Sequence, residues 1–271
     1  MSEVAHPAPE SLRAYEARTP RRQFTDTAGN DWSYRDNGHA GTALPLVLLP
    51  GALGTGSAAW HVAEAFEEER RVVAVTYPGG IAPEALADGL HALLASLGIG
   101  PIALWGSSYG AWWAQVFATR HRAQAAALWL GNTLVDGADV AASPLFDAAW
   151  LDTATAGAVM ARWHGALSAR PADPLRTVQL HMHMLHHGLP AAAFRGRLRQ
   201  VANAVAPQAA TDIASTVVCD CEDDPTITPQ VRERVRARYP AAHRLTLASG
   251  GHYPHIVTPE PLIAAMRSWL A

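Results

Sequence analysis

The segment Gly106-Ser107-Ser108-Tyr109-Gly110 holds two adjacent serines between glycines. A serine at the centre of G-x-S-x-G, between a strand and a helix, is typical of a nucleophile on a tight and strained turn. Glycines two positions to either side leave room for the neighbouring backbone. This spacing selects Ser108, because Ser107 occupies the intervening position.

A serine hydroxyl is a weak nucleophile unless a base takes its proton, and histidine is the commonest base. The stretch LASGGHYPHI places His252 directly after two glycines at the end of an expected strand. His255 follows three residues later and is the competing candidate, with a partly buried loop position as its alternative role. We predict His252 as the base, because the glycine-rich loop would let its imidazole reach over the sheet.

An acid should orient the histidine, and on this kind of scaffold it follows the preceding strand. The stretch VVCDCEDDPTITP offers Asp220, Glu222, Asp223 and Asp224. Asp224 precedes Pro225, where the chain must leave the strand. Asp224 is therefore the predicted acid, with Asp223 as its main rival. We expect the other acids to be solvated loop charges or charges at the start of the next helix.

Attack on a carbonyl also requires two backbone N–H donors for the oxyanion. One donor is expected at Tyr109, directly after the serine. The other is expected in the loop LLPGALGTG, with Ala52 as the predicted donor and Leu53 as the alternative. The helix that follows the serine would turn the positive end of its dipole toward the same oxyanion.

Apolar runs and helical patterns alternate along the chain in the order that would position these residues. A hairpin is expected around residues 28–30. Runs that predict strands lie at 44–51, 71–79, 101–108, 125–134, 215–224 and 242–251, and the first two are typical of buried strands. Helical patterns lie at 57–70, 82–99, 109–122, 228–240 and 258–271. This alternation predicts an α/β fold with a mostly parallel central sheet and helices on both faces.

The alternation breaks once, between residues 136 and 210, where helical segments are punctuated by prolines. The predicted organisation is a core of residues 21–135 and 211–271 with a helical cap inserted at 136–210. Residues 1–20 should form an N-terminal arm, either loose or folded into a short helix. The cap would lie over the strand ends and shape the substrate pocket.

The expected cap carries an apolar stripe and a cluster of histidines. Leu145, Phe146 and Trp163 belong to the stripe, which is typical of core packing but would also suit a lipophilic acyl or alcohol group. The histidines of LHMHMLHHGL have no carboxylate or cysteine close by in the sequence. We therefore expect a histidine-rich cap surface and no metal site.

Composition limits the other classes of function. The chain has 271 residues and a formal net charge of −3, so a nucleic-acid partner or an anionic membrane surface is not expected. No apolar stretch reaches the roughly 20 residues that span a bilayer, and no secretory signal is apparent. Cys219 and Cys221 would point to opposite faces of a strand, so no disulfide between them is expected. These features predict a cytoplasmic protein that acts on a small molecule without a cofactor, and they leave its oligomeric state open.

Five segments together resemble the α/β-hydrolase superfamily: LPLVLLPGALGTGSAAW, VVAVTYPG, LWGSSYGAWWAQVFA, CEDDPTITP and ASGGHYPHI. Within it, PGALGTG, LWLGNTLVD, RLRQVANA and RYPAAHRLTLASGGHYPH look most like the maspardin-like branch. The resemblance implies an α/β-hydrolase fold and a serine hydrolase with a triad of Ser108, His252 and Asp224. Many hydrolases of this superfamily carry His-Gly where this chain has Pro50-Gly51. Some maspardin-like proteins lack the histidine that this chain keeps.

Three functions are compatible with this resemblance. The first is hydrolysis of an ester, thioester or related acyl bond through an acyl-enzyme. The second keeps the same site for acyl transfer, lactone formation or hydrolysis of a C–C bond. The third is a maspardin-like binding protein with a vestigial site, which a serine-directed phosphonate would not label.

Overall fold

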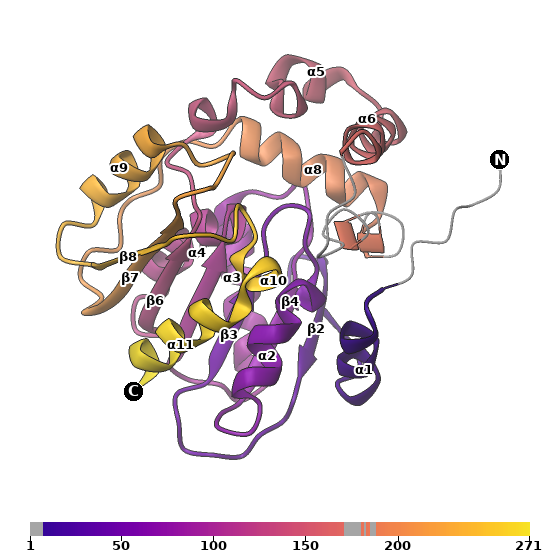
Figure 1. Cartoon of the computed structure of the whole chain (residues 1–271). Helices are drawn as coiled ribbons and strands as arrows, with labels where there is room; N and C mark the ends of the chain where they lie inside the picture. The colour runs from indigo at the N-terminus through magenta and orange to yellow at the C-terminus, as the bar shows by residue number, and fades with distance from the viewer. Residues whose placement is uncertain (1–7, 171–179, 182, 185–187) are drawn as a thin grey trace.

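The computed structural model describes residues 8–170, 180–181, 183–184 and 188–271 (Figure 1). Eight strands form one sheet in the order β1-β2-β4-β3-β5-β6-β7-β8. All neighbours from β4 to β8 in this order pair in parallel, whereas β2 is antiparallel to both β1 and β4. The strands are β1 (Arg22–Thr25), β2 (Asp31–Asp36), β3 (Leu46–Leu49), β4 (Val72–Thr76), β5 (Ile102–Ser107), β6 (Ala125–Gly131), β7 (Ser215–Cys221) and β8 (His243–Leu247). The predicted mostly parallel sheet is confirmed.

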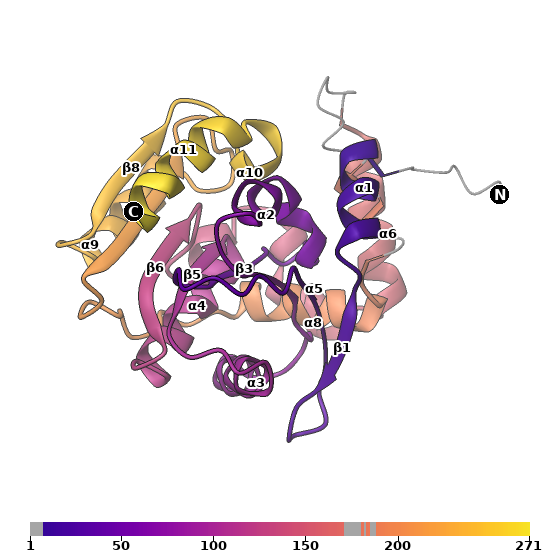
Figure 2. The ribbon, with the colours of Figure 1, turned by 90° about the horizontal axis from the view of Figure 1, so that it is seen from below.

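Helices cover both faces of this sheet, as Figure 2 shows for α2 and α11 on one side and α3 on the other. The central strands are buried on both faces because alternate side chains point in opposite directions. In β3, Val47 and Leu49 join one apolar core, while Leu46 and Leu48 join the other. The helices are α1 (Glu10–Arg18), α2 (Trp60–Phe66), α3 (Pro83–Ser96), α4 (Tyr109–Arg120), α5 (Ala148–Thr153), α6 (Ala156–Ser168), α8 (Ala191–Ala202), α9 (Pro229–Arg238), α10 (Pro254–Val257) and α11 (Pro259–Leu270).

The helix expected at 57–70 is shorter than its apolar pattern predicts. A 3-10 turn, Gly56–Ala59, precedes α2, and the Thr55 side chain accepts a hydrogen bond from the Ser57 N–H. Gly56 lies so close to β4 that a Cβ there would come 2.5 Å from the Ala74 carbonyl oxygen. Packing against the sheet therefore decides where this helix can begin.

The segment between β6 and β7 contains two 3-10 turns, Gly137–Val140 and Pro144–Phe146, followed by α5, α6 and α8. Figure 1 shows these three helices together above the sheet. Of the four histidines noted in this segment, His186 and His187 lie outside the described residues.

The N-terminal residues from 10 to 18 form helix α1, which packs onto the core through buried Leu12 and Tyr15. Cys219 and Cys221 are both free and buried. Across the described part of the chain, no helix combines the length and apolar character needed to span a bilayer.

Candidate active site

Ser108 sits on the turn between β5 and α4 in a strained backbone conformation, with φ of 54° and ψ of −124°. Such a positive φ is costly for a residue with a side chain and is typical of functional turns. A Cβ on Gly106 would lie 2.5 Å from the Ala111 Cα, and one on Gly110 would lie 2.5 Å from the Pro50 carbonyl oxygen. Both glycines are therefore required by the close approach of backbone around Ser108.

The structure brings Ser108, His252 and Asp224 into one line of hydrogen bonds. Ser108 Oγ lies 2.9 Å from His252 Nε2, and His252 Nδ1 lies 2.9 Å from Asp224 Oδ2. His252 is 8% exposed and Asp224 is 6% exposed, so the contact between them is shielded from solvent. Their roles in a reaction remain predictions, but their relative geometry is that of a nucleophile, a base and an orienting acid.

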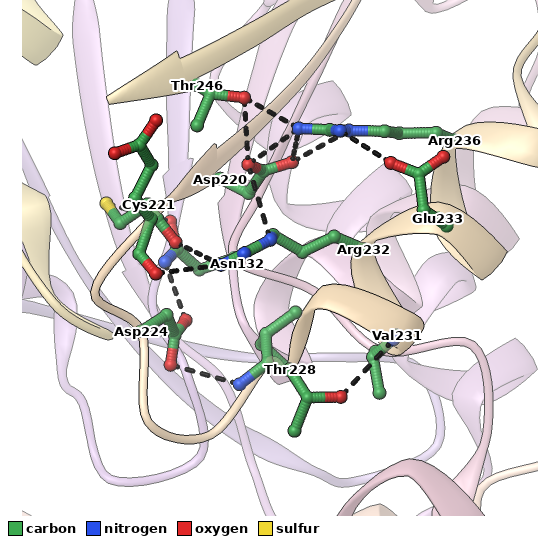
Figure 3. A network of polar contacts seen from close by, with 12 residues as sticks. Asn132, Asp220, Cys221, Asp224, Thr228, Val231, Arg232, Glu233, Arg236 and Thr246 are labelled. Carbon is green, nitrogen blue, oxygen red and sulfur yellow. Dashed lines mark hydrogen bonds and ion pairs between the residues drawn. The ribbon is translucent and has the colours of Figure 1, made fainter. Parts of the chain in front are cut away.

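The Asp224 carboxylate is held from several directions. Its Oδ1 accepts backbone hydrogen bonds from Thr226, at 2.7 Å, and Ile227, at 3.0 Å, while its Oδ2 also accepts one from Asn132 Nδ2 at 2.7 Å (Figure 3). Burial alone would raise the pKa of Asp224, but attraction to His252 and these hydrogen bonds lower it to about 2. The carboxylate is therefore ionised at neutral pH.

Asn132 joins two parts of the site, and the sequence pattern alone did not identify it. Its side-chain N–H₂ donates to Asp224 and also to the Gly251 carbonyl at 3.0 Å, directly before His252. Its φ is 44°, a conformation that asparagine tolerates better than most residues. The signal in the sequence was an Asn directly after strand β6, whose carboxyl end lies beside that of β5.

The rival acid, Asp223, has a different environment. Its exposed carboxylate accepts backbone hydrogen bonds from Gly250, at 3.2 Å, and Gly251, at 2.8 Å. The structure therefore places Asp223 under the loop that carries His252, whereas Asp224 contacts the imidazole itself.

Asp220 is not the solvated charge that we expected. It is buried in β7 and forms an ion pair with Arg236, whose Nη2 lies 2.8 Å from Asp220 Oδ2 (Figure 3). Thr246 donates to the same carboxylate at 3.1 Å. The reason is that Asp220 faces helix α9, so this carboxylate stabilises the packing of that helix and does not reach His252.

His255 is also more buried than expected, at 3% exposure, and it lies in helix α10. Its ring packs edge-on against Trp105, with the ring centroids 5.3 Å apart. Burial, together with the neighbouring histidines, lowers the pKa of His255 to about 3, so the imidazole stays neutral. Ser108 is contacted by His252 and not by this competitor.

The loop after β3 approaches Ser108 from the opposite side. Gly51–Gly54 is a tight turn closed by a hydrogen bond of 2.9 Å from the Gly54 N–H to the Gly51 carbonyl. A Cβ on Gly51 would lie 3.6 Å from Ser108 Oγ, which shows how near the turn is. Among the described residues, the N–H groups of Ala52 and Leu53 have no hydrogen-bond partner. Tyr109 is the first residue of α4, so its N–H has no partner within the helix.

A cavity of about 310 Å³ opens onto Ser108 and His252. Its walls are mostly apolar and come from both the core and the segment between β6 and β7. Apolar side chains that line it include Leu53, Leu134, Leu145, Phe146, Trp163 and Ile256. A pocket of this kind suits a small substrate with an apolar part.

Within the described residues, no three His, Cys, Asp or Glu side chains are grouped so that they could hold a metal ion. The imidazole of His252 lies within hydrogen-bond distance of both Ser108 and Asp224.

Comparison with known proteins agrees with the fold. Maspardin from Homo sapiens is 27% identical over 237 residues, which cover 83% of this chain and 74% of that protein. An esterase from Thermogutta terrifontis superposes with a TM-score of 0.69 at 23% identity, covering 92% of this chain and 97% of that one. An enol-lactonase from Burkholderia xenovorans LB400 superposes with a TM-score of 0.73 at 18% identity, covering 92% and 99%. The model of the alpha/beta hydrolase family matches residues 46–265, and the chain therefore belongs to that family.

Proposed function

We propose that this protein is a serine hydrolase that cleaves an ester, thioester or related acyl bond of a small apolar substrate. The observation that carries the proposal is the pair of 2.9 Å contacts that joins Ser108 to His252 and His252 to Asp224. The strained turn under Ser108 and the adjoining apolar cavity support it.

In the proposed reaction, Ser108 Oγ attacks the substrate carbonyl carbon and His252 Nε2 takes the hydroxyl proton. The carbonyl oxygen becomes an oxyanion, which the N–H groups of Tyr109 and of Ala52 or Leu53 would stabilise. As the bond to the leaving group breaks, His252 gives its proton to the departing alcohol or thiol. Water then attacks the acyl-enzyme by the same route and releases the acid and free Ser108.

Asp224 would hold the Nδ1–H of His252 and stabilise the positive charge that the imidazole gains. Its pKa of about 2 supports this role, because the carboxylate keeps its negative charge throughout the neutral range. A neutral His255 nearby adds no competing positive charge to the cavity.

Labelling with a fluorophosphonate, followed by mass mapping of the adduct, tests the proposal together with hydrolysis of p-nitrophenyl esters of increasing acyl length. We expect one adduct on Ser108 and ester hydrolysis that both disappear in Ser108→Ala. Ser107→Ala is the matched control, because this neighbouring serine ends β5 and should be dispensable. Full activity in Ser108→Ala would refute the mechanism.

The same test distinguishes two alternative functions from the proposed one. Labelling of Ser108 without release of acid from esters would favour acyl transfer, lactone formation or C–C bond hydrolysis at the same site, and product analysis would separate these. A folded protein that neither labels nor hydrolyses would favour a binding role, which the similarity to maspardin makes a natural second candidate. A cytoplasmic location remains part of the proposal, supported by the two free and buried cysteines.

A further inference from the structure

One arginine beside the site is buried without an acidic partner. Arg197 lies in helix α8 and is 0% exposed. Its guanidinium stacks over the Tyr77 ring, with Cζ 3.7 Å from the ring centroid. No carboxylate among the described residues pairs with it, and its Nε has no hydrogen-bond partner there. A buried cation with so little compensation is costly, which calls for a role other than stability.

The hydrogen bonds that Arg197 does form all go to backbone carbonyls around the Gly51–Gly54 turn. Nη1 donates to the Gly54 carbonyl at 2.7 Å and to the Ala52 carbonyl at 3.4 Å, and Nη2 donates to the Tyr77 carbonyl. The Tyr77 hydroxyl in turn donates to the Pro50 carbonyl at 3.0 Å. The carbonyls of Pro50, Ala52 and Gly54 are therefore held by Arg197 and by the hydroxyl group of Tyr77.

Holding these carbonyls also fixes the direction of the N–H groups in the turn. In a planar trans peptide the C=O and N–H point in opposite directions. The Ala52 carbonyl on Arg197 therefore turns the Leu53 N–H away from the guanidinium, while the Gly51 carbonyl is held by the Gly54 N–H and leaves the Ala52 N–H outside the turn.

Helix α8 is a firm base for such a contact. Its Gly196 packs against the loop after β4 so closely that a Cβ there would lie 2.5 Å from the Gly80 nitrogen. A Cβ on Gly79 would likewise overlap the Ala193 carbonyl of α8. The backbones touch, so Arg197 cannot shift without moving the helix or the loop.

We propose that Arg197 is a positioning residue for the oxyanion hole, holding the Gly51–Gly54 turn so that its free N–H groups face the carbonyl under attack by Ser108. This inference rests on the proposed function and extends it. It makes α8, a helix of the inserted segment, a structural part of the transition-state site as well as a wall over the pocket. The guanidinium itself does not touch the substrate.

The test compares Arg197→Met, which keeps the apolar stem, with Arg197→Lys, which keeps the positive charge but loses the planar guanidinium with its two Nη donors. Arg199→Met is the matched control, because Arg199 lies on the same helix and is exposed in an ion pair with Asp152. We would measure kcat and KM for the best p-nitrophenyl ester, per site titrated by the fluorophosphonate. We would also measure the inhibition constant of a trifluoromethyl ketone with the same acyl group, since its adduct with Ser108 places an oxyanion in the hole.

We expect Arg197→Met to lower kcat about 100-fold and to weaken the ketone by a similar factor, with little change in KM. Arg197→Lys should fall between this variant and the wild type, and Arg199→Met should behave as the wild type. A merely structural role would lower the number of titratable sites without changing kcat per site or ketone affinity, and this result in either Arg197 variant would overturn the inference. If Arg197→Met does not fold, Arg197→Lys decides by the same two quantities.

Failure of the proposed function has a separate signature. A folded wild-type protein that neither labels nor hydrolyses esters would overturn both ideas. An active wild type whose Arg197 variants keep kcat and ketone affinity within twofold would overturn this inference alone.

Discussion

On one side of Ser108, carboxylates hold the His252 imidazole and the loop that carries it, whereas on the other side an arginine and a tyrosine hold the Gly51–Gly54 turn and the residue before it. Asp224 contacts the ring at 2.9 Å, and Asp223 holds the loop beneath it. Arg197 instead binds carbonyls of the turn, and Tyr77 binds the Pro50 carbonyl directly before it.

The difference follows from the charge that would develop on each side during the proposed reaction. A histidine that takes a proton becomes positive, so an acid beside it stabilises the new charge. A turn that meets an oxyanion must present N–H groups, so its carbonyls have to point elsewhere, and a buried guanidinium offers them donors. Opposite charges on the two supports would thus serve the same proposed reaction.

The largest expected effect comes from removing the charge that supports His252. Asp224→Asn should lower kcat about 10⁴-fold, because an amide favours the wrong tautomer of His252 and cannot stabilise its positive charge. Asp223→Asn, the neighbouring control, should lower kcat less than tenfold, since Asp223 contacts only the loop backbone. Steady-state kinetics on one ester measures both. Equal losses in the two variants would contradict the division of roles between these acids.

Asn132 supports the same side indirectly, because it contacts Asp224 and not His252. Asn132→Ala removes hydrogen bonds to the Asp224 carboxylate and the Gly251 carbonyl, and we expect kcat to fall about 10- to 100-fold. The exposed Asn203→Ala is a suitable control. An Asn132→Ala variant with normal kcat would show that Thr226 and Ile227 hold the carboxylate well enough alone.

Acid should distinguish the two sides, because only one of them depends on a titrating group. The pKa of Asp224 is about 2 in the folded protein, below the value of about 3.9 in an unfolded chain. Its ionised form therefore stabilises the fold above about pH 4, and this contribution, about 2 kcal/mol, is lost as the pH falls from about 4 to about 2.

Urea unfolding of wild type and Asp224→Asn at pH 6 and at pH 2.5 measures this contribution. The difference in unfolding free energy between the two proteins should shrink by about 1–2 kcal/mol at the lower pH. Other carboxylates titrate in both proteins and cancel. A difference that does not change with pH would show that the folded and unfolded pKa values are equal. Arg197→Met should show no such change relative to the wild type, since arginine stays charged throughout.

The smallest expected effect comes from removing one hydrogen bond beside the Gly51–Gly54 turn. Tyr77→Phe removes the hydrogen bond to the Pro50 carbonyl but keeps the ring under Arg197. The loss should be about 1 kcal/mol, seen as roughly a fivefold fall in kcat or an equivalent loss of stability in thermal unfolding. A loss as large as that of Arg197→Met would mean that the tyrosine, not the arginine, sets the turn.

The sequence determined the parallel sheet, the order of its elements along the chain, and two of the three side chains now found in line, Ser108 and His252. Buried parallel strands have long apolar runs, and the residues that follow them gather at one edge of the sheet. Local chemistry was enough to select Ser108 by its glycines and His252 by its loop. The helix expected at 57–70 shows the limit of this reasoning, because its start depends on contact with β4.

Only the tertiary structure decided between Asp223 and Asp224, since adjacent residues in a turn point in different directions and each is fixed by partners far along the chain. It alone showed Asp220 turned toward Arg236, and Asn132 joined to an acid 92 residues away. Arg197 reaches the turn across 143 residues, and its partners are carbonyls, which every residue carries. Backbone acceptors leave no pattern in residue types, so the support of the oxyanion turn becomes visible only when the chain is folded.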